Sequence, residues 1–215
     1  MIEWSLDAFR GCDTVAAIVV AAPSGHEHDL GGVAGPDGND LTVVDGGATR
    51  AQSVANALAA VGTELVAIHD AARPLLTAAL VEGLVGHLAA APEAAAVIAA
   101  APIADTVKCA SPRPGGTKTA LTPHDGANAL FVEETLDRSS LWAAQTPQVF
   151  RAEELRAALD VDAEARDAAT DEAMLVEAAG GAVLIHPVAA ENFKVTTPLD
   201  LRLAELLLAD RGGTE

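Results

Sequence analysis

The sequence predicts an α/β fold in one domain, with a mostly parallel sheet, helices on both of its faces and a protruding β-arm. Residues 41–101 alternate as strand, helix, strand, helix and strand, an order that favours parallel strands joined by right-handed crossovers. The strands at 65–68 and 95–101 are unbroken apolar runs, as expected of strands buried on both faces. Residues 105–150 interrupt the alternation with antiparallel strands, which define the arm. The length of 215 residues and the 50% hydrophobic content suit a single packed core over residues 1–215.

The first half of the chain carries most of the predicted parallel sheet. In order, its predicted elements are a helix at 4–10, strands at 14–22 and 41–44, a helix at 50–60, a strand at 65–68, a helix at 78–88 and a strand at 95–101. Thr49 and Thr77 stand directly before two of these helices. Both are predicted N-caps, because a threonine hydroxyl accepts a hydrogen bond from a first-turn N–H that has no partner inside the helix.

The second half begins with the arm and returns to helices. Its predicted elements are strands at 105–108, 131–135 and 141–148, helices at 152–159 and 171–179, a strand at 182–188, a short strand or extended link at 192–196 and a helix that opens at 197–200. Thr170 is the predicted N-cap of the helix at 171–179. A long β-arm cannot bury its apolar face alone, so the arm at 105–150 predicts a two-fold homodimer.

Acidic residues dominate the charge of the chain. Asp and Glu total 31 against 13 Lys and Arg, for a net charge of -18. Binding to nucleic acids or to anionic membranes requires a positively charged protein surface. An aromatic content of 3% also provides few side chains for stacking on bases. The composition therefore excludes both partner classes, although a small anionic ligand could still be bound by a local group of Arg and Lys.

Cysteines and histidines point to no metal site. The spacing of Cys12 and Cys109 does not indicate a disulfide framework, and both are interpreted as reduced thiols of a cytoplasmic protein. His26 and His28 have no third ligand near them in the sequence, so a solvated loop is the favoured interpretation. The apolar run at 15–22 is too short to span a bilayer, and the acidic residues before it do not resemble a secretory signal.

Four small clusters of polar residues should meet at one edge of the predicted sheet. They are Gly46-Gly47 with Arg50 and Ser53, Asp70 with Arg73, Asp105 with Lys108, and Lys194. In open α/β sheets ligands bind outside the carboxyl ends of the strands. Glycines before a helix let backbone N–H groups approach a phosphate, and Arg73 and Lys194 are suited to neutralising its oxygens. Asp70 is suited to holding a magnesium ion or to orienting a substrate hydroxyl.

Five motifs in order resemble one enzyme family. They are Gly47-x-x-Arg50-x-x-Ser53-Val54, His69-Asp70-Ala71-Ala72-Arg73-Pro74, Thr146-Pro147-Gln148-x-Phe150, Thr170-Asp171-Glu172 and Asn192-Phe193-Lys194-Val195-Thr196-x-Pro198-x-Asp200-Leu201. Together they resemble 2-C-methyl-D-erythritol 4-phosphate cytidylyltransferase, an enzyme of the non-mevalonate pathway of isoprenoid biosynthesis. The resemblance covers nearly the whole chain.

The resemblance implies a Rossmann-like nucleotidyltransferase fold, dimerised through the β-arm, with CTP and a polyol phosphate as substrates and Mg²⁺ as cofactor. Methylerythritol phosphate would attack the α-phosphate of CTP and release pyrophosphate. By motif, Gly47, Arg50 and Ser53 would bind the nucleotide. Asp70 and Lys194 would be catalytic, and Arg73 would gather the sugar phosphate. Thr135 and Arg151 would reach the substrate from the partner subunit.

One feature of the family is not found in the sequence. The family begins with a strand and a glycine-rich loop of the form A-A-G-x-G-x-R, which cradles the CTP triphosphate. Here Met1 to Phe9 match the family's first helix instead, so the resemblance predicts a chain without that strand and loop. Two alternatives stay open: a cytidylyltransferase for another polyol phosphate such as ribitol 5-phosphate, and a non-catalytic dimeric remnant.

Overall fold

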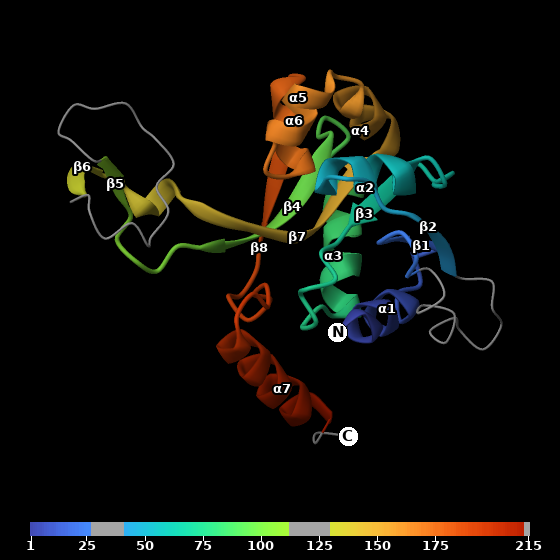
Figure 1. Cartoon of the computed structure of the whole chain (residues 1–215), viewed down its shortest axis with the longest axis horizontal. Helices are drawn as coiled ribbons and strands as arrows, with labels where there is room; N and C mark the ends of the chain where they lie inside the picture. The colour runs from blue at the N-terminus through green and yellow to red at the C-terminus, as the bar shows by residue number, and fades with distance from the viewer. Residues whose placement is uncertain (27–40, 112–129, 213–215) are drawn as a thin grey trace. The chain divides into compact units, whose positions relative to one another are not determined.

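The computed structural model of the chain describes residues 1–26, 41–111 and 130–212, and it divides into two compact units (Figure 1). The first unit comprises Met1–Ala100 and Ala144–Glu215, and the second comprises Ala101–Ala143. His28 lies outside the described residues. Within the described ranges, no helix combines the length and apolar content needed to cross a membrane.

Among the described residues, the first unit contains the α-helices and most of the strands. Its helices are α1 (Ile2–Arg10), α2 (Arg50–Leu58), α3 (Ala78–Ala89), α4 (Ala152–Leu159), α5 (Ala163–Ala168), α6 (Glu172–Ala178) and α7 (Pro198–Gly212). Its strands are β1 (Ile18–Ala22), β2 (Leu41–Asp45), β3 (Leu65–Ile68), β4 (Ala96–Pro102), β7 (Trp142–Arg151) and β8 (Val183–Pro187), of which β4 and β7 run to the boundary with the second unit.

The strands of the first unit form two sheets. β1 and β2 pair in parallel, and a four-stranded sheet has the order β3-β7-β4-β8. In this second sheet β4 and β8 are parallel, whereas β3 and β7 are antiparallel with Leu65 opposite Arg151. The predicted α/β fold is confirmed, with a mixed sheet in place of one largely parallel sheet. The residues from 144 onwards, predicted as part of the arm, belong to the first unit, and the side chains from Gln145 to Phe150 are buried in the middle of this sheet.

Helices cover both faces of the four-stranded sheet. Alternate residues of β4 point to opposite faces, so that Ala96 and Ile98 pack with α4 and α6, whereas Val97 and Ala99 pack with α3. All of β4 from residue 96 to 101 is buried, as expected of a central strand. The small alanine side chains let the helices approach the sheet closely.

Local sequence explains how the helices begin. The side chain of Thr49 accepts a hydrogen bond from the N–H of Gln52, and that of Thr77 accepts one from the N–H of Leu80, so both predicted N-caps are confirmed. Thr170 was the wrong choice for α6. Asp171 caps that helix through the N–H of Met174, and the helix therefore begins one residue later than predicted.

The second unit is built on a two-stranded antiparallel ribbon. β5 (Lys108–Ser111) pairs with β6 (Phe131–Thr135), with an irregularity between Cys109 and Ala110. All five residues of β6 are exposed, including the side chains of Phe131 and Val132. A short 3-10 helix, η2 (Arg138–Ser140), follows the ribbon.

Candidate active site

The backbone at the end of β3 is fixed by hydrogen bonds from two directions. The N–H of Arg73 donates to the carbonyl of Asp70 at 2.9 Å, which closes a turn directly after the strand. The N–H of Asp70 donates to the hydroxyl oxygen of Thr146, on β7, also at 2.9 Å. Asp70 is therefore positioned by its backbone at the edge of the four-stranded sheet.

His69 is held as a neutral ring at the same turn. Since the hydroxyl oxygen of Thr146 accepts from Asp70, its own hydrogen is free to donate to His69 Nδ1, which lies 3.1 Å away. The Nε2–H of His69 then donates to the carbonyl of Arg73 at 3.2 Å. Burial lowers the pKa of His69 to about 4, against the smaller raising effects of these hydrogen bonds and of Asp70. The ring therefore orients the turn and carries no charge near neutral pH.

Three cationic side chains surround the carboxylate of Asp70. The Nζ of Lys194 lies 3.0 Å from Oδ2, the Nε of Arg50 lies 3.3 Å from Oδ1, and the Nε of Arg73 lies 3.9 Å from Oδ2. Burial alone would raise the pKa of Asp70. The hydrogen bond from Lys194 and the charge of Arg50 outweigh burial and lower the pKa, so Asp70 is ionised near neutral pH.

A buried glutamate holds Arg50 in place. The Nη1 of Arg50 lies 2.6 and 2.7 Å from the two carboxylate oxygens of Glu172, whose side chain is only 1% exposed. Burial would lower the pKa of Arg50, but its hydrogen bond and charge interaction with Glu172 outweigh burial and raise it. A buried carboxylate is costly unless it is paired, so Glu172 and Arg50 stabilise each other's charge. Glu172 thereby aims Arg50 at Asp70.

Arg73 and Lys194 are joined to the site through the segment after β8. The Nη1 of Arg73 donates to the carbonyl of Asn192 at 2.8 Å, and the Asn192 side-chain amide donates to the carbonyl of Thr146 at 2.8 Å. Burial lowers the pKa of Arg73, and the charge of Asp70 opposes this shift. The Nε of Arg73 is buried with no hydrogen-bond partner among the described residues. The site thus retains donor capacity for an anionic ligand.

The glycine loop before α2 is packed tightly. The N–H of Gly47 donates to the hydroxyl oxygen of Ser53 at 3.0 Å, and that hydroxyl donates to the carbonyl of Thr49 at 2.9 Å. The N–H of Gly46 donates to the carbonyl of Ala22 at the end of β1 at 2.6 Å. A Cβ at Gly47 would collide with the Gln52 side chain and would lie 2.9 Å from the Gln52 carbonyl carbon. The loop therefore requires glycine at this position.

Replacing Gly47 by alanine should destabilise the fold. The added Cβ must displace Gln52 and the first turn of α2, so we expect Gly47→Ala to lower the free energy of unfolding by about 1–3 kcal/mol. Urea denaturation measures this change. Gly62→Ala is the control, because nothing lies within 4 Å of a Cβ there. Equal effects of the two substitutions would contradict the proposed steric cause.

Arg151 is the last residue of β7 and contacts the end of α3. Its Nε donates to the carbonyl of Ala94 at 3.0 Å, and its Nη2 donates to those of Ala91 and Leu88 at 3.3 and 3.4 Å. A cation at a helix C-terminus is electrostatically favourable. The carbonyls of Leu88 and Ala91 also accept from the backbone N–H groups of Ala91 and Ala94, so Arg151 is a second donor to each of them. Arg151 therefore has a structural role in this chain. Its predicted role in binding the substrate of the partner subunit stays a prediction.

Removing the Arg151 side chain should cost stability. We expect Arg151→Ala to lower the free energy of unfolding by about 1–3 kcal/mol, because three carbonyls lose a side-chain donor. Arg151→Lys keeps the charge and should recover only about 0.3–1 kcal/mol of that loss. Both values come from urea denaturation. A stability unchanged in Arg151→Ala would show that these hydrogen bonds contribute nothing.

Three residues predicted to belong to the site, Asp105, Lys108 and Thr135, lie in the second unit. The Nζ of Lys108 donates to the hydroxyl oxygen of Thr135 at 2.7 Å across the ribbon, and Asp105 belongs to the same unit. The predicted meeting of Asp105 and Lys108 with the other clusters therefore stays a prediction, as does the role of Thr135.

The structure brings together Arg50, Asp70, Arg73 and Lys194, as predicted, and adds Glu172 to them. Glu172 was named only as the last residue of the Thr170-Asp171-Glu172 motif and was given no role, because its position is that of an ordinary first-turn acid and its partner is 122 residues away. Among the described residues, no group of three or more His, Cys, Asp or Glu could hold a metal ion by itself. Of the two carboxylates in this network, the side chain of Asp70 is 17% exposed to solvent and that of Glu172 is 1% exposed.

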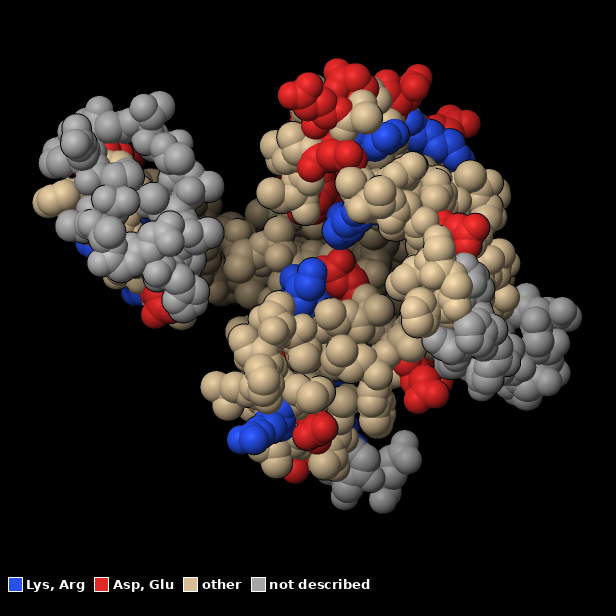
Figure 2. Space-filling view, viewed as in Figure 1, with Lys and Arg blue, Asp and Glu red and all other residues tan. Residues whose placement is uncertain are grey.

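Charge on the surface is distributed unevenly. Figure 2 shows acidic side chains gathered over α5 and α6, where Glu164, Asp167 and Glu177 are exposed. Basic side chains are few on this face, and some of them lie near its middle. Within the network around Asp70, three cations contact two carboxylates, so cationic groups exceed acidic ones there although the chain is strongly acidic overall. Such a local excess suits an anionic ligand.

Comparisons with known proteins agree on one family. The family model described as IspD, 2-C-methyl-D-erythritol 4-phosphate cytidylyltransferase, matches residues 1–210. A cytidylyltransferase of that name from Bordetella petrii is 38% identical over 208 residues, which cover 95% of this chain and 84% of the relative. The crystal structure of the enzyme of the same name from Thermus thermophilus has a TM-score of 0.73 at 34% identity and covers 97% of this chain and 88% of its own.

Some relatives are much longer. A bifunctional enzyme IspD/IspF from Anaeromyxobacter sp. (strain Fw109-5) is 43% identical over 204 residues, which cover 94% of this chain and 48% of the relative. The chain thus spans about half the length of the bifunctional relatives that it matches.

Proposed function

The chain belongs to the 2-C-methyl-D-erythritol 4-phosphate cytidylyltransferase family, and from that premise we propose that it transfers a cytidylyl group from CTP to 2-C-methyl-D-erythritol 4-phosphate. An oxygen of the sugar phosphate attacks the α-phosphorus of CTP and forms a new P–O bond. The bond from that phosphorus to the bridging oxygen breaks, and pyrophosphate leaves. The observation that carries the proposal is the convergence of Arg50, Arg73 and Lys194 on Asp70.

The proposed roles follow from charge and position. Lys194 and Arg73 supply positive charge where two phosphate groups must approach each other, and the resulting loss of repulsion stabilises the transition state. Asp70 orients both cations and thus fixes where that charge lies. Gly47 and Ser53, at the start of α2, bind the nucleotide together with Arg50. Catalysis of this kind is mostly positioning and electrostatic stabilisation.

Asp70 is also the group that fits a magnesium ion. Mg²⁺ in nucleotide-transferring sites is commonly bound by one or two carboxylates together with substrate phosphates. Asp70 is ionised and part-exposed, and the described residues offer no cluster of three ligands, so most ligands would come from CTP. When bound, the ion would neutralise phosphate charge.

The second unit supports a proposed homodimer. Its ribbon exposes Phe131 and Val132, which an isolated two-stranded ribbon cannot bury. In the dimer, Thr135 and Arg151 of one subunit would reach the substrate of the other. Cys12 and Cys109 are free thiols, which is consistent with a proposed location in the cytoplasm.

The direct test is pyrophosphate release from CTP in the presence of Mg²⁺ and methylerythritol phosphate. Ribitol 5-phosphate in a parallel reaction distinguishes the two polyol phosphates. A second preparation carries, fused ahead of Met1, the segment that precedes the matched region in a relative. Turnover in either preparation supports the proposal. If neither turns over and calorimetry detects no CTP binding, the chain is a non-catalytic dimeric protein and the proposal is wrong.

A further inference from the structure

Two histidines meet outside the network around Asp70. His87 lies in the last turn of α3, and His186 lies on β8, the edge strand of the four-stranded sheet. Their Nδ1 atoms are 3.4 Å apart, whereas the centres of their rings are 5.5 Å apart. The Nδ1 edges of the two rings therefore face each other. The two residues are 99 positions apart in the sequence, so no local spacing could indicate the pair.

The packing of α3 on β8 places the two rings. Leu184 and Val188, two residues before and two residues after His186, pack in the same apolar cluster as the buried leucines of α3. Since alternate residues of a strand share a face, His186 also faces the helix. A Cβ at Gly83, one turn before His87, would lie 3.4 Å from Cε1 and 3.6 Å from Nε2 of His186. The far side of the ring thus lies against the helix, and Nδ1 is directed at His87.

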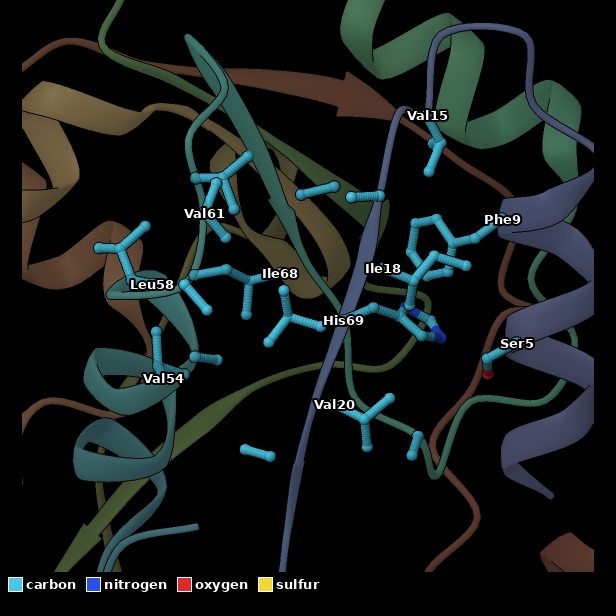
Figure 3. Close-up of a pocket in the computed structure, with 18 of the residues that line it drawn as sticks. Ser5, Phe9, Val15, Ile18, Val20, Val54, Leu58, Val61, Ile68 and His69 are labelled. Carbon is cyan, nitrogen blue, oxygen red and sulfur yellow. The ribbon is translucent and has the colours of Figure 1, made fainter. Parts of the chain in front are cut away.

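The pair differs from His69, which lines the apolar cavity drawn in Figure 3. Both ring nitrogens of His69 have a partner, in the hydroxyl of Thr146 and the carbonyl of Arg73. Within the described ranges, the contact between His87 and His186 is the only side-chain hydrogen bond of either ring. It is longer than the distance of about 2.7–3.2 Å that is usual for a hydrogen bond from nitrogen. These two rings therefore retain nitrogen atoms for a ligand.

We propose that His87 and His186 form a two-histidine site for a divalent transition metal ion of the Zn²⁺ class, which joins α3 to β8. Imidazole nitrogen suits Zn²⁺, Cu²⁺ and Ni²⁺, whereas Mg²⁺ prefers oxygen ligands. Around a tetrahedral ion with Zn–N distances of about 2.0–2.1 Å, two nitrogen ligands are roughly 3.3–3.4 Å apart. The two Nδ1 atoms already have this separation, so the helix and the strand need not move to admit the ion.

Each ring supplies one lone pair, and water supplies the other ligands. With its hydrogen on Nε2, each neutral ring presents the lone pair of Nδ1 to the ion. No third His, Cys, Asp or Glu joins the pair among the described residues, and both histidines are only half-buried, so solvent reaches them. The net charge of -18 favours a cation over an anion here. The ion would be exchangeable, and when bound it would fasten the edge strand to the helix.

Calorimetric titration of the full chain with ZnCl₂ tests the site, in the presence of an excess of Mg²⁺ that occupies sites built from oxygen ligands. We expect one Zn²⁺ to bind per chain, and we expect His87→Gln and His186→Gln each to abolish this binding. His26→Gln is the matched control, because His26 is an exposed histidine outside the pair. That variant should bind Zn²⁺ as the parent chain does.

Two further measurements need no loss of a ligand. In ¹H–¹⁵N spectra of the parent chain, Zn²⁺ should shift the Nδ1 signals of both His87 and His186, which decides the question even if a variant fails to fold. At a Zn²⁺ concentration ten times the dissociation constant, the equilibrium constant for unfolding in urea should fall about tenfold. The absence of Zn²⁺ binding, undiminished binding in either Gln variant, or a shift confined to one ring would each overturn the proposal.

Discussion

Replacing Asp70 by asparagine should lower the rate of pyrophosphate release by about 100- to 1000-fold in the preparation that shows turnover, the cost typical of losing one preorganised electrostatic contact in a transition state. The substitution keeps the size of the side chain and removes its charge. Lys194 and Arg50 then lose the carboxylate that lies 3.0 and 3.3 Å from them. Arg50 is still held by Glu172, whereas the charge of Lys194 remains in the site but is no longer held at one position.

The same substitution should not weaken the binding of CTP. Removing a carboxylate from beside three cations increases the positive charge available to an anion, so we expect the loss in kcat with an unchanged or tighter dissociation constant for CTP measured without Mg²⁺. Turnover kinetics and calorimetry measure the two quantities separately. Asp167→Asn is the control, because Asp167 is an exposed carboxylate bonded to Thr49 at 2.8 Å. Weaker CTP binding in Asp70→Asn with unchanged kcat would contradict the proposed role.

The parts of this site that lie next to a strand end could be predicted from the sequence. Asp70 and Arg73 follow an apolar run, and the rule that ligands gather at the carboxyl ends of strands places them at the sheet edge. The structure confirms that Lys194 meets them there. The predicted caps at Thr49 and Thr77 are also confirmed. A cap is a local interaction, because each side chain bonds to an N–H only three residues further along the chain.

Contacts over long separations could not be predicted in this way. Glu172 pairs with Arg50 across 122 residues, and no local pattern distinguishes it from an ordinary first-turn acid. The position of β7 was missed for a related reason. Its arm and sheet portions form one continuous strand, and only the burial of residues such as Phe150 marks where the central sheet begins. The segment 192–196, predicted as a short strand or extended link, forms no strand.

His69 should make the stability of the fold depend on pH between pH 6.5 and 4. Burial lowers its pKa to about 4 in the folded chain, against an ordinary value of 6.5 when the chain is unfolded. In this window the unfolded chain binds the proton and the folded chain does not, so the free energy of unfolding falls as the pH falls. At 1.36 kcal/mol for each unit of pKa difference, the loss at pH 4.5 is about 2–3 kcal/mol.

Asp70 and His186 also have lowered pKa values, and their effects must be separated from that of His69. The pKa of Asp70 is lowered from 3.8, so its contribution to stability is lost only as the pH falls below that value, outside the window. Burial, and next the charge of His87, lower the pKa of His186, but that ring is more exposed to solvent and should contribute less. A comparison of pH 7 with pH 4.5 therefore isolates His69 once His186 is controlled.

His69→Gln removes the titrating group and keeps a side chain able to donate to the carbonyl of Arg73. Urea denaturation at pH 7 and pH 4.5 should show that the variant loses about 2–3 kcal/mol less stability on acidification than the parent chain. His186→Gln should change this difference far less. A parent chain and a His69→Gln variant with the same pH dependence would mean that the ring is protonated in the folded state. Thr146 would then have to accept a hydrogen bond from His69 Nδ1 as well as from the N–H of Asp70, with its own hydrogen directed elsewhere.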